Sequence, residues 1–357
     1  MSGETTTLKT PSELRAHLRA GQAIPALPLA LTRTRRWDER RQRALVRYYI
    51  DAEVGGLAVG VHSTQFAIRD SQVGLYRPVL QLAAETAEAW KKTSRATNPL
   101  AMIAGLCGRT QQAVAEARTA RQLGYHAGLL SLGAWKRDDE AAVLKHCQRV
   151  AAEIPLVGFY LQPAVGGRVF SYEFWQRFVE IPDVVAVKVA PFDRYRTNDV
   201  VRAVLEGGRD DVALYTGNDD NILGDLLTPF SFGGRTRFFD GGLLGQWGVW
   251  TQRAVQLFRE VQRARMRRRI DPLWLTRNAA WTDANAAIFD SAHGFSGCLP
   301  GIHEVLRRAG LLQSVACLDP HEQLSTGQAD EITRVARENP WLTDEVFTAE
   351  NRHRWLA

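Results

Sequence analysis

The sequence alternates short apolar runs with amphipathic stretches, and this alternation limits the folds open to the chain. The apolar runs predict buried strands at 24–31, 56–61, 100–106, 126–132, 154–160, 184–189, 212–215 and, less clearly, 236–240. The amphipathic stretches predict helices at 39–52, 77–92, 111–123, 140–153, 172–180, 197–206, 219–230 and 247–268. Such alternation favours βαβ units around a parallel sheet.

Eight such units over about 250 residues match the size of a (β/α)8 TIM barrel. A doubly wound open sheet is the main rival, but no GxGxxG motif follows the first predicted strand. We therefore expect an N-terminal segment (1–23), a (β/α)8 barrel (24–269) and a C-terminal helical region (270–357). Helices are predicted in that last region at 272–291, 299–309 and 328–339.

The composition is that of a soluble globular protein, with 45% hydrophobic and 24% charged residues among 357. No apolar run reaches the roughly 18 residues that span a bilayer, and the first ten residues are polar. We expect a cytoplasmic protein without membrane contact. The four cysteines are scattered, which predicts free thiols and no metal site.

The formal net charge is +6, and arginines concentrate in the segment 259–269. Leu257, Val261 and Ile270 put apolar side chains within and beside this run. That spacing suits the exposed face of a long helix or a subunit contact. No nucleic-acid-binding motif accompanies it, so we expect no nucleic-acid partner.

Lys188 is the most informative single residue, because it ends a run that otherwise reads as a buried strand. Burial lowers the pKa of a lysine and frees the neutral amine, which attacks a carbonyl to form a Schiff base. Tyr160 ends the preceding strand, 28 residues earlier, and a hydroxyl near such an amine can move the protons that imine formation requires. The alternative is a lysine that extends to solvent or pairs with an acid, and a tyrosine that belongs to the core.

Four segments match known motifs. Tyr-Leu-Gln-Pro at 160–163 is similar to a YNxP-like motif at the end of strand five, and Val-Ala-Val-Lys at 185–188 to an IGIKE-like motif on strand six. Ile-Ala-Gly at 103–105 and Thr-Gly-Asn-Asp at 216–219 fit further motifs of strands three and seven. On these residues the chain resembles a divergent member of the dihydrodipicolinate synthase / N-acetylneuraminate lyase family of Schiff-base-forming barrels.

The resemblance implies Lys188 as the Schiff-base lysine and Tyr160 as the proton shuttle. It places Gly217 and Asp219 at the substrate, although 218–220 also suits the N-cap of the next helix. It requires no metal and no organic cofactor, and it implies a homo-oligomer, commonly a dimer or tetramer.

The family motif that holds a keto-acid carboxylate falls on 60–64, where Val61 and His62 replace two threonines. Ser63 and Thr64 still offer hydroxyls, and backbone N–H groups in such a turn bind a carboxylate whatever the side chains are. We expect His62, Ser63 and Thr64 to line the substrate pocket. His62 has two alternative roles, proton transfer and capping of the loop. The alternative for the hydroxyls of Ser63 and Thr64 is hydrogen bonding to the local backbone.

Two further departures argue against a true dihydrodipicolinate synthase. Val165 stands where the synthases carry a carboxylate-gripping arginine, and Arg168 is three residues too late to be equivalent. Trp135 corresponds roughly to the relay tyrosine and offers only an apolar or stacking wall. Arg235 and Arg237 have two alternative roles: they bind an anionic group of the substrate, or they lie on the protein surface.

The function we expect is a lyase or aldolase that acts on a pyruvate-like 2-oxo acid and an aldehyde. A 2-oxo acid dehydratase or a hydratase-aldolase on the same scaffold is the first alternative. A barrel without catalysis, which binds a small molecule, is the second.

Overall fold

The computed structural model describes residues 8–267 and 270–357. These residues form two compact units. One unit joins the described residues up to Gln22 with Pro99–Leu243, and the other joins Ala23–Asn98 with Leu244–Ala357. The predicted ends of the helix at 268 and of the barrel at 269 lie outside the described residues.

The first unit is built on parallel strands in the order β10-β7-β6-β5-β4-β3. Nearly every residue of these strands is buried, as expected of a parallel sheet covered on both faces. The strands are β3 (Ala101–Leu106), β4 (Ala127–Leu130), β5 (Leu156–Leu161), β6 (Val184–Ala190), β7 (Ala213–Thr216) and β10 (Gly241–Leu244).

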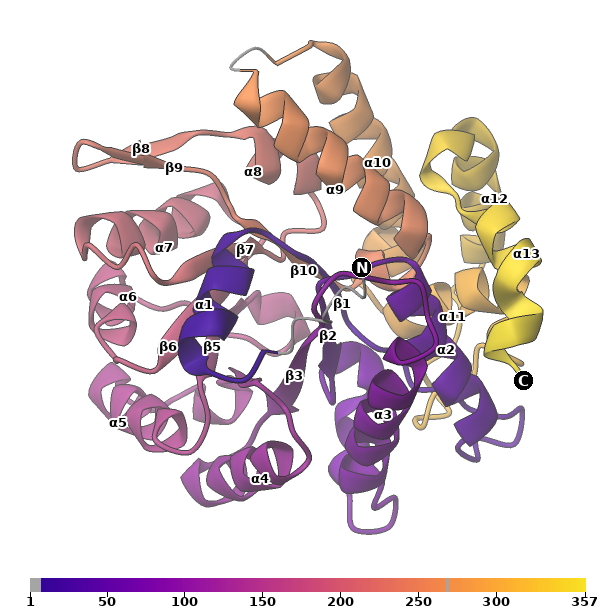
Figure 1. Ribbon diagram of the computed structural model, residues 1–357, viewed down its shortest axis with the longest axis horizontal. Coiled ribbons are helices and arrows are strands. Elements are labelled where there is room, and N and C mark those ends of the chain that lie inside the picture. The colour runs from indigo at the N-terminus through magenta and orange to yellow at the C-terminus, as the bar shows by residue number, and fades with distance from the viewer. Residues whose placement is uncertain (1–7, 268–269) are drawn as a thin grey trace. The chain divides into compact units, whose positions relative to one another are not determined.

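Helices follow these strands in sequence, and Figure 1 shows α4 to α7 along the outer side of β3 to β7. Polar N-caps begin three of them, because Asp139, Ser171 and Asp193 accept hydrogen bonds from the first turns of α5, α6 and α7. The helices are α4 (Thr110–Gln122), α5 (Glu140–Ala151), α6 (Tyr172–Val179), α7 (Arg194–Glu206) and α8 (Ile222–Leu227).

An unpredicted helix, α1 (Pro11–Arg19), lies at the amino-terminal ends of β6 and β7. A capping box starts it, since Thr10 Oγ1 accepts from the Glu13 N–H while Glu13 accepts from the Thr10 N–H. Arg15 donates to the carbonyl of Val184 at 2.8 Å and to Asp211 at 2.6 Å. These bonds hold the helix against the start of β6.

The second unit contains the first two strands of the chain, β1 (Ala23–Pro25) and β2 (Gly56–Val59). They are neighbours through a parallel bridge between Ala26 and Ala58. Helices α2 and α3 pack together, as do α2 and α13, and α10 and α12. The helices are α2 (Glu39–Asp51), α3 (Tyr76–Lys91), α9 (Thr251–Met266), α10 (Leu273–Phe289), α11 (Cys298–Arg308), α12 (Gln328–Glu338) and α13 (Glu345–Trp355).

The predicted fold class is confirmed: eight parallel strands alternate with helices as in a (β/α)8 barrel, and helices follow. One strand prediction was wrong. The segment 236–240 is not the eighth barrel strand, because 235–237 form β9 (Arg235–Arg237), which pairs antiparallel with β8 (Phe230–Phe232). Gly233 and Gly234 make the hairpin turn with positive φ, and the eighth strand is β10.

The faces of β5 are fixed by its contacts with α6. A Cβ built on Gly158 would lie 2.6 Å from Cε1 of Phe178 and 3.5 Å from a methyl of Val187. Gly158 therefore faces the helix layer. Because side chains alternate along a strand, Tyr160 shares that outer face, and Phe159 faces the other side of the sheet.

This assignment predicts that Gly158→Ala overpacks the contact with α6. We expect a loss of about 1–3 kcal/mol in the free energy of unfolding, measured by urea denaturation. Adding Phe178→Leu should recover part of the loss, because it removes the ring that the new methyl meets. An unchanged midpoint for Gly158→Ala would contradict the face assignment.

Candidate active site

Lys188 lies on the inner face of β6, together with Ala190. A Cβ built on Gly217 would lie 2.6 Å from Cε of Lys188 and 2.8 Å from Cβ of Ala190. Glycine at 217 therefore leaves the room that the lysine chain occupies. The neighbouring strands place Phe159 and Tyr215 in register with Lys188, so these residues share its face of the sheet.

The surroundings of Lys188 change its acidity. Burial lowers the pKa of the amine to about 8, and the carboxylate of Asp219 opposes that shift. The Nζ atom lies 4.4 Å from the centre of the Phe159 ring, an arrangement that favours the ammonium form modestly. The amine therefore loses its proton at a lower pH than an ordinary lysine does.

Buried hydrogen bonds anchor the loop that carries Asp219. Asn218 accepts from the N–H of Phe192 at 3.0 Å and donates to Asp225 at 2.9 Å. Asp225 also accepts from the hydroxyl of Thr216 at 2.6 Å and pairs with Arg194. Fully satisfied buried networks hold side chains in one arrangement. This one ties the loop after β7 to the loop after β6.

Tyr160 does not share the face of Lys188. Its ring centre lies 4.9 Å from that of Trp175 on α6 and 6.1 Å from that of Phe170. Its hydroxyl oxygen accepts a hydrogen bond from the N–H of Phe170 at 3.4 Å, and burial raises the pKa of the phenol. The side chain is part of the packing between the sheet and α6.

A register shift explains this position. Leu156 pairs with Val184, but Val157 pairs with Ala186, so β6 carries one extra residue at this point. If the pairing of Leu156 with Val184 continued along the strands, Tyr160 would stand opposite Lys188. Because of the shift, Phe159 pairs with Lys188 instead, and Tyr160 lies on the outer face.

Trp135 is buried in a loop after β4, where its ring lies 4.6 Å from the ring of His146. Burial lowers the pKa of His146 to about 4. Arg109 stacks on the ring of Trp135. Arg168 donates to the backbone carbonyls of Trp135 at 2.7 Å and Asp138 at 2.8 Å, and so fixes this loop.

The segment His62, Ser63 and Thr64 forms a short 3-10 turn directly after β2 in the second unit. Thr64 is fully buried, and its hydroxyl donates to the carbonyl of Leu27 at 2.7 Å and accepts from the N–H of Gly60 at 2.9 Å. Thr64 therefore holds the turn together. Ser63 is buried, and the ring of His62 lies 6.0 Å from that of Phe66.

The two arginines near β9 have structural partners. Arg237 donates to Asp240 and to the carbonyl of Val212, each at 2.9 Å. Arg235 lies 3.5 Å from Asp210 on an exposed hairpin. Both arginines support the hairpin and its base.

No group of three or more His, Cys, Asp or Glu side chains within 8–267 and 270–357 is placed to hold a metal ion. In the same ranges, no helix combines the length and the apolar character of a membrane span.

The barrel and its inner-face lysine define a class, the (β/α)8 proteins with an amine on strand six. Residues 20–234 match the model of the dihydrodipicolinate synthetase family. This match covers more than half of the chain, so the chain belongs to that family and the predicted resemblance is confirmed.

Individual relatives are distant. N-acetylneuraminate lyase 2 of Escherichia coli O6:H1 is 22% identical over 88% of this chain and 92% of its own. The crystal structure of N-acetylneuraminate lyase from Fusobacterium nucleatum has a TM-score of 0.69 at 18% identity, covering 90% of this chain and 99% of that one. YagE of Escherichia coli K12, solved in complex with pyruvate, has a TM-score of 0.71 at 15% identity, covering 89% and 98%.

Sequence reasoning did not find Phe159 or the Asn218–Asp225 network. Phe159 stands next to the tyrosine that carries the family motif, and only the register distinguishes the two positions. Asn218 and Asp225 lie seven residues apart, on either side of the start of α8, so the sequence does not pair them. Only Asn218 has a sequence signal, because it belongs to the polar run that follows β7.

The position of Lys188 predicts a cost in stability. Below pH 8 the ammonium is charged in both states, and its burial destabilises the fold. Between pH 8 and pH 10.5 the unfolded chain binds the proton more tightly, so this contribution to stability rises with pH. We expect Lys188→Met to raise the free energy of unfolding by about 1–3 kcal/mol at pH 7.

Urea denaturation of both proteins at pH 7 and pH 10 checks this prediction. The advantage of the methionine variant should shrink at pH 10, where the native amine is neutral. A methionine variant less stable than the parent at pH 7 would show that the ammonium is well paired.

Proposed function

We propose that the chain is a class I lyase or aldolase that forms a Schiff base between Lys188 and a pyruvate-like 2-oxo acid. The observation that carries the proposal is the amine on the inner face of β6 with a pKa of about 8. At pH 7 roughly a tenth of such an amine is neutral, against less than one part in a thousand for an ordinary lysine. Membership of the dihydrodipicolinate synthetase family supports it.

The reaction begins when the neutral amine attacks the ketone carbon and gives a carbinolamine. Loss of water leaves an iminium at C2, which draws electrons from the C3–C4 bond, one bond removed from the iminium carbon. Cleavage of that bond, with loss of the proton of the C4 hydroxyl, releases an aldehyde and leaves an enamine. Protonation of the enamine at C3 and hydrolysis by water then give the 2-oxo acid and free Lys188. Condensation is the same sequence in reverse.

The proton transfers need a group near the amine. We assign them to Asp219, because its carboxylate acts on the charge of Lys188 and its loop is anchored through Asn218. Tyr160 was expected in this role, but its hydroxyl bonds to Phe170 on the outer face of the sheet. Phe159, beside the amine, has no proton to give.

The remaining site residues are proposed to hold the substrate. Gly217 leaves room for the side chain of Lys188, and Ser63 and the backbone of 62–64 would bind the carboxylate. His62 and Trp135 would line the pocket. Val165 in place of a carboxylate-gripping arginine supports an aldehyde without a second carboxylate, and hence an activity other than that of dihydrodipicolinate synthase.

Borohydride trapping with pyruvate, followed by peptide mapping, tests the lysine. We expect a reduced pyruvyl adduct on Lys188 and none in Lys188→Ala. If pyruvate fails, larger 2-oxo acids that label Lys188 would show altered specificity of the 62–64 turn. No adduct with any 2-oxo acid would contradict the proposal and favour a non-catalytic barrel.

The proton carrier is tested with the variants Tyr160→Phe and Asp219→Asn. The first should form the adduct at nearly the parental rate, whereas the second should slow adduct formation by about 10²-fold or more. Asp219→Asn should also move the pH midpoint of adduct formation downward, because the carboxylate raises the pKa of Lys188. Loss of the reaction in Tyr160→Phe alone would return the role to the tyrosine.

A further inference from the structure

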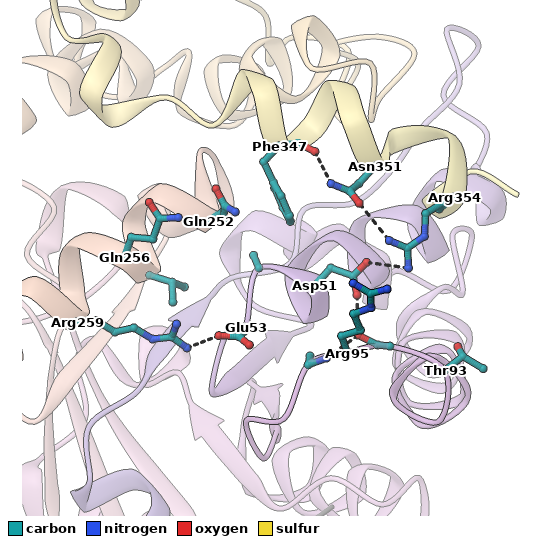
Figure 2. A pocket seen from close by; sticks show the side chains of 14 residues that line it. Asp51, Glu53, Thr93, Arg95, Gln252, Gln256, Arg259, Phe347, Asn351 and Arg354 are labelled. Atoms are coloured by element: carbon teal, nitrogen blue, oxygen red, sulfur yellow. Dashed lines mark hydrogen bonds and ion pairs between the residues drawn. The ribbon is translucent and has the colours of Figure 1, made fainter. Parts of the chain in front are cut away.

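A polar cavity of about 770 Å³ lies in the second unit, between the ends of α2 and α3 and one side each of α9 and α13 (Figure 2). Residues 51–53 line it just before β2, whereas the 62–64 turn follows that strand. The cavity is therefore at the other end of β2 from the turn. Its lining is Asp51, Ala52, Glu53, Thr93, Ser94, Arg95, Ala96, Gln252, Val255, Gln256, Arg259, Phe347, Asn351 and Arg354.

The carboxylates of the cavity already have partners. Asp51 accepts from Ser94 Oγ at 2.7 Å, from Trp90 Nε1 at 2.9 Å and from Trp355 Nε1 at 2.8 Å. Glu53 pairs with Arg259 at 2.5 Å. All three donors are neutral, so the Asp51 carboxylate keeps its single negative charge.

Two guanidinium groups lie on the side of the cavity that holds this single negative charge. Arg354 lies 3.9 Å from Asp51 and donates to Asn351 at 3.1 Å. Figure 2 shows Arg95 on the same side of the cavity, next to Asp51. Within 8–267 and 270–357, Arg95 has no carboxylate in ion-pair distance. This corner therefore carries one excess positive charge, which an anion can neutralise.

The opposite side of the cavity contains a strained residue. Glu53 has a φ of +61° directly after the end of α2, a position that glycine usually occupies. The chain keeps a glutamate there, and its carboxylate reaches Arg259 on α9. Backbone strain of this kind persists where the surroundings or a function require the side chain. The Glu53–Arg259 pair closes this side with no net charge.

We propose that this cavity binds a small organic anion, with its carboxylate or phosphate group between Arg95 and Arg354. Neutral polar groups of the ligand would lie toward the amides of Gln252 and Gln256 and the Glu53–Arg259 pair. Val255 and Phe347 supply apolar contacts. A volume of this size is within the range of small-molecule sites. The site is independent of Lys188 chemistry.

Isothermal titration calorimetry of the full chain at low salt tests the proposal with three matched probes. Glycerate carries a carboxylate, glycerol 3-phosphate carries a phosphate, and glycerol is neutral. We expect saturable one-to-one binding of at least one of the two acids and none of glycerol. The acid that binds more tightly identifies the acidic group.

The Arg95→Gln variant should weaken binding of that acid at least tenfold, because it removes a charge-assisted hydrogen bond. The control is Arg337→Gln, which changes a 75% exposed arginine on α12 and should leave binding unchanged. Lys188→Ala should also bind the acid as the parent does, which separates this site from the proposed active site. Absence of binding by both acids, or equal affinity in Arg95→Gln, would overturn the proposal.

Discussion

The extra residue in β6 decides which side chains surround Lys188. After it, Phe159 rather than Tyr160 stands in register with the lysine. The amine then has a ring at 4.4 Å on one side, and on another the missing side chain of Gly217 leaves room for the lysine chain itself. Neither neighbour can accept a proton, so the carboxylate of Asp219 is the group through which the site adjusts the charge of the amine.

Two opposing effects set the acidity of that amine. Desolvation disfavours the ammonium and is the larger effect, while Asp219 favours it. The pKa of the amine is about 8, below that of an ordinary lysine, so a larger fraction of the amine is neutral at pH 7. The rigid network from Asn218 to Asp225 keeps the carboxylate in place and so keeps this balance constant. A looser loop would allow water to reach the amine and would restore its usual pKa.

The barrel fold and the site lysine were predictable from the sequence. Alternating apolar and amphipathic segments predicted the barrel. The lysine in an apolar run predicted an amine of lowered pKa, and the side chain is half-buried. The face of Tyr160 was not predictable, because Leu156–Leu161 is apolar throughout and has no alternation to distinguish its two faces. The register shift between Leu156 and Val157 left no sequence signal either. The prediction of a barrel strand at 236–240 was wrong because the residues of the β8–β9 hairpin resemble those of a barrel strand.

The most direct test of this account is the pKa of Lys188 itself. Reductive methylation with ¹³C-formaldehyde and NMR titration, with Lys188→Met to assign the signal, measures it in the folded protein. We expect a midpoint near pH 8 that falls further in Asp219→Asn. A midpoint near 10.5, the value of an ordinary lysine, would contradict it, because the amine would then be hydrated or fully paired and no nucleophile at neutral pH.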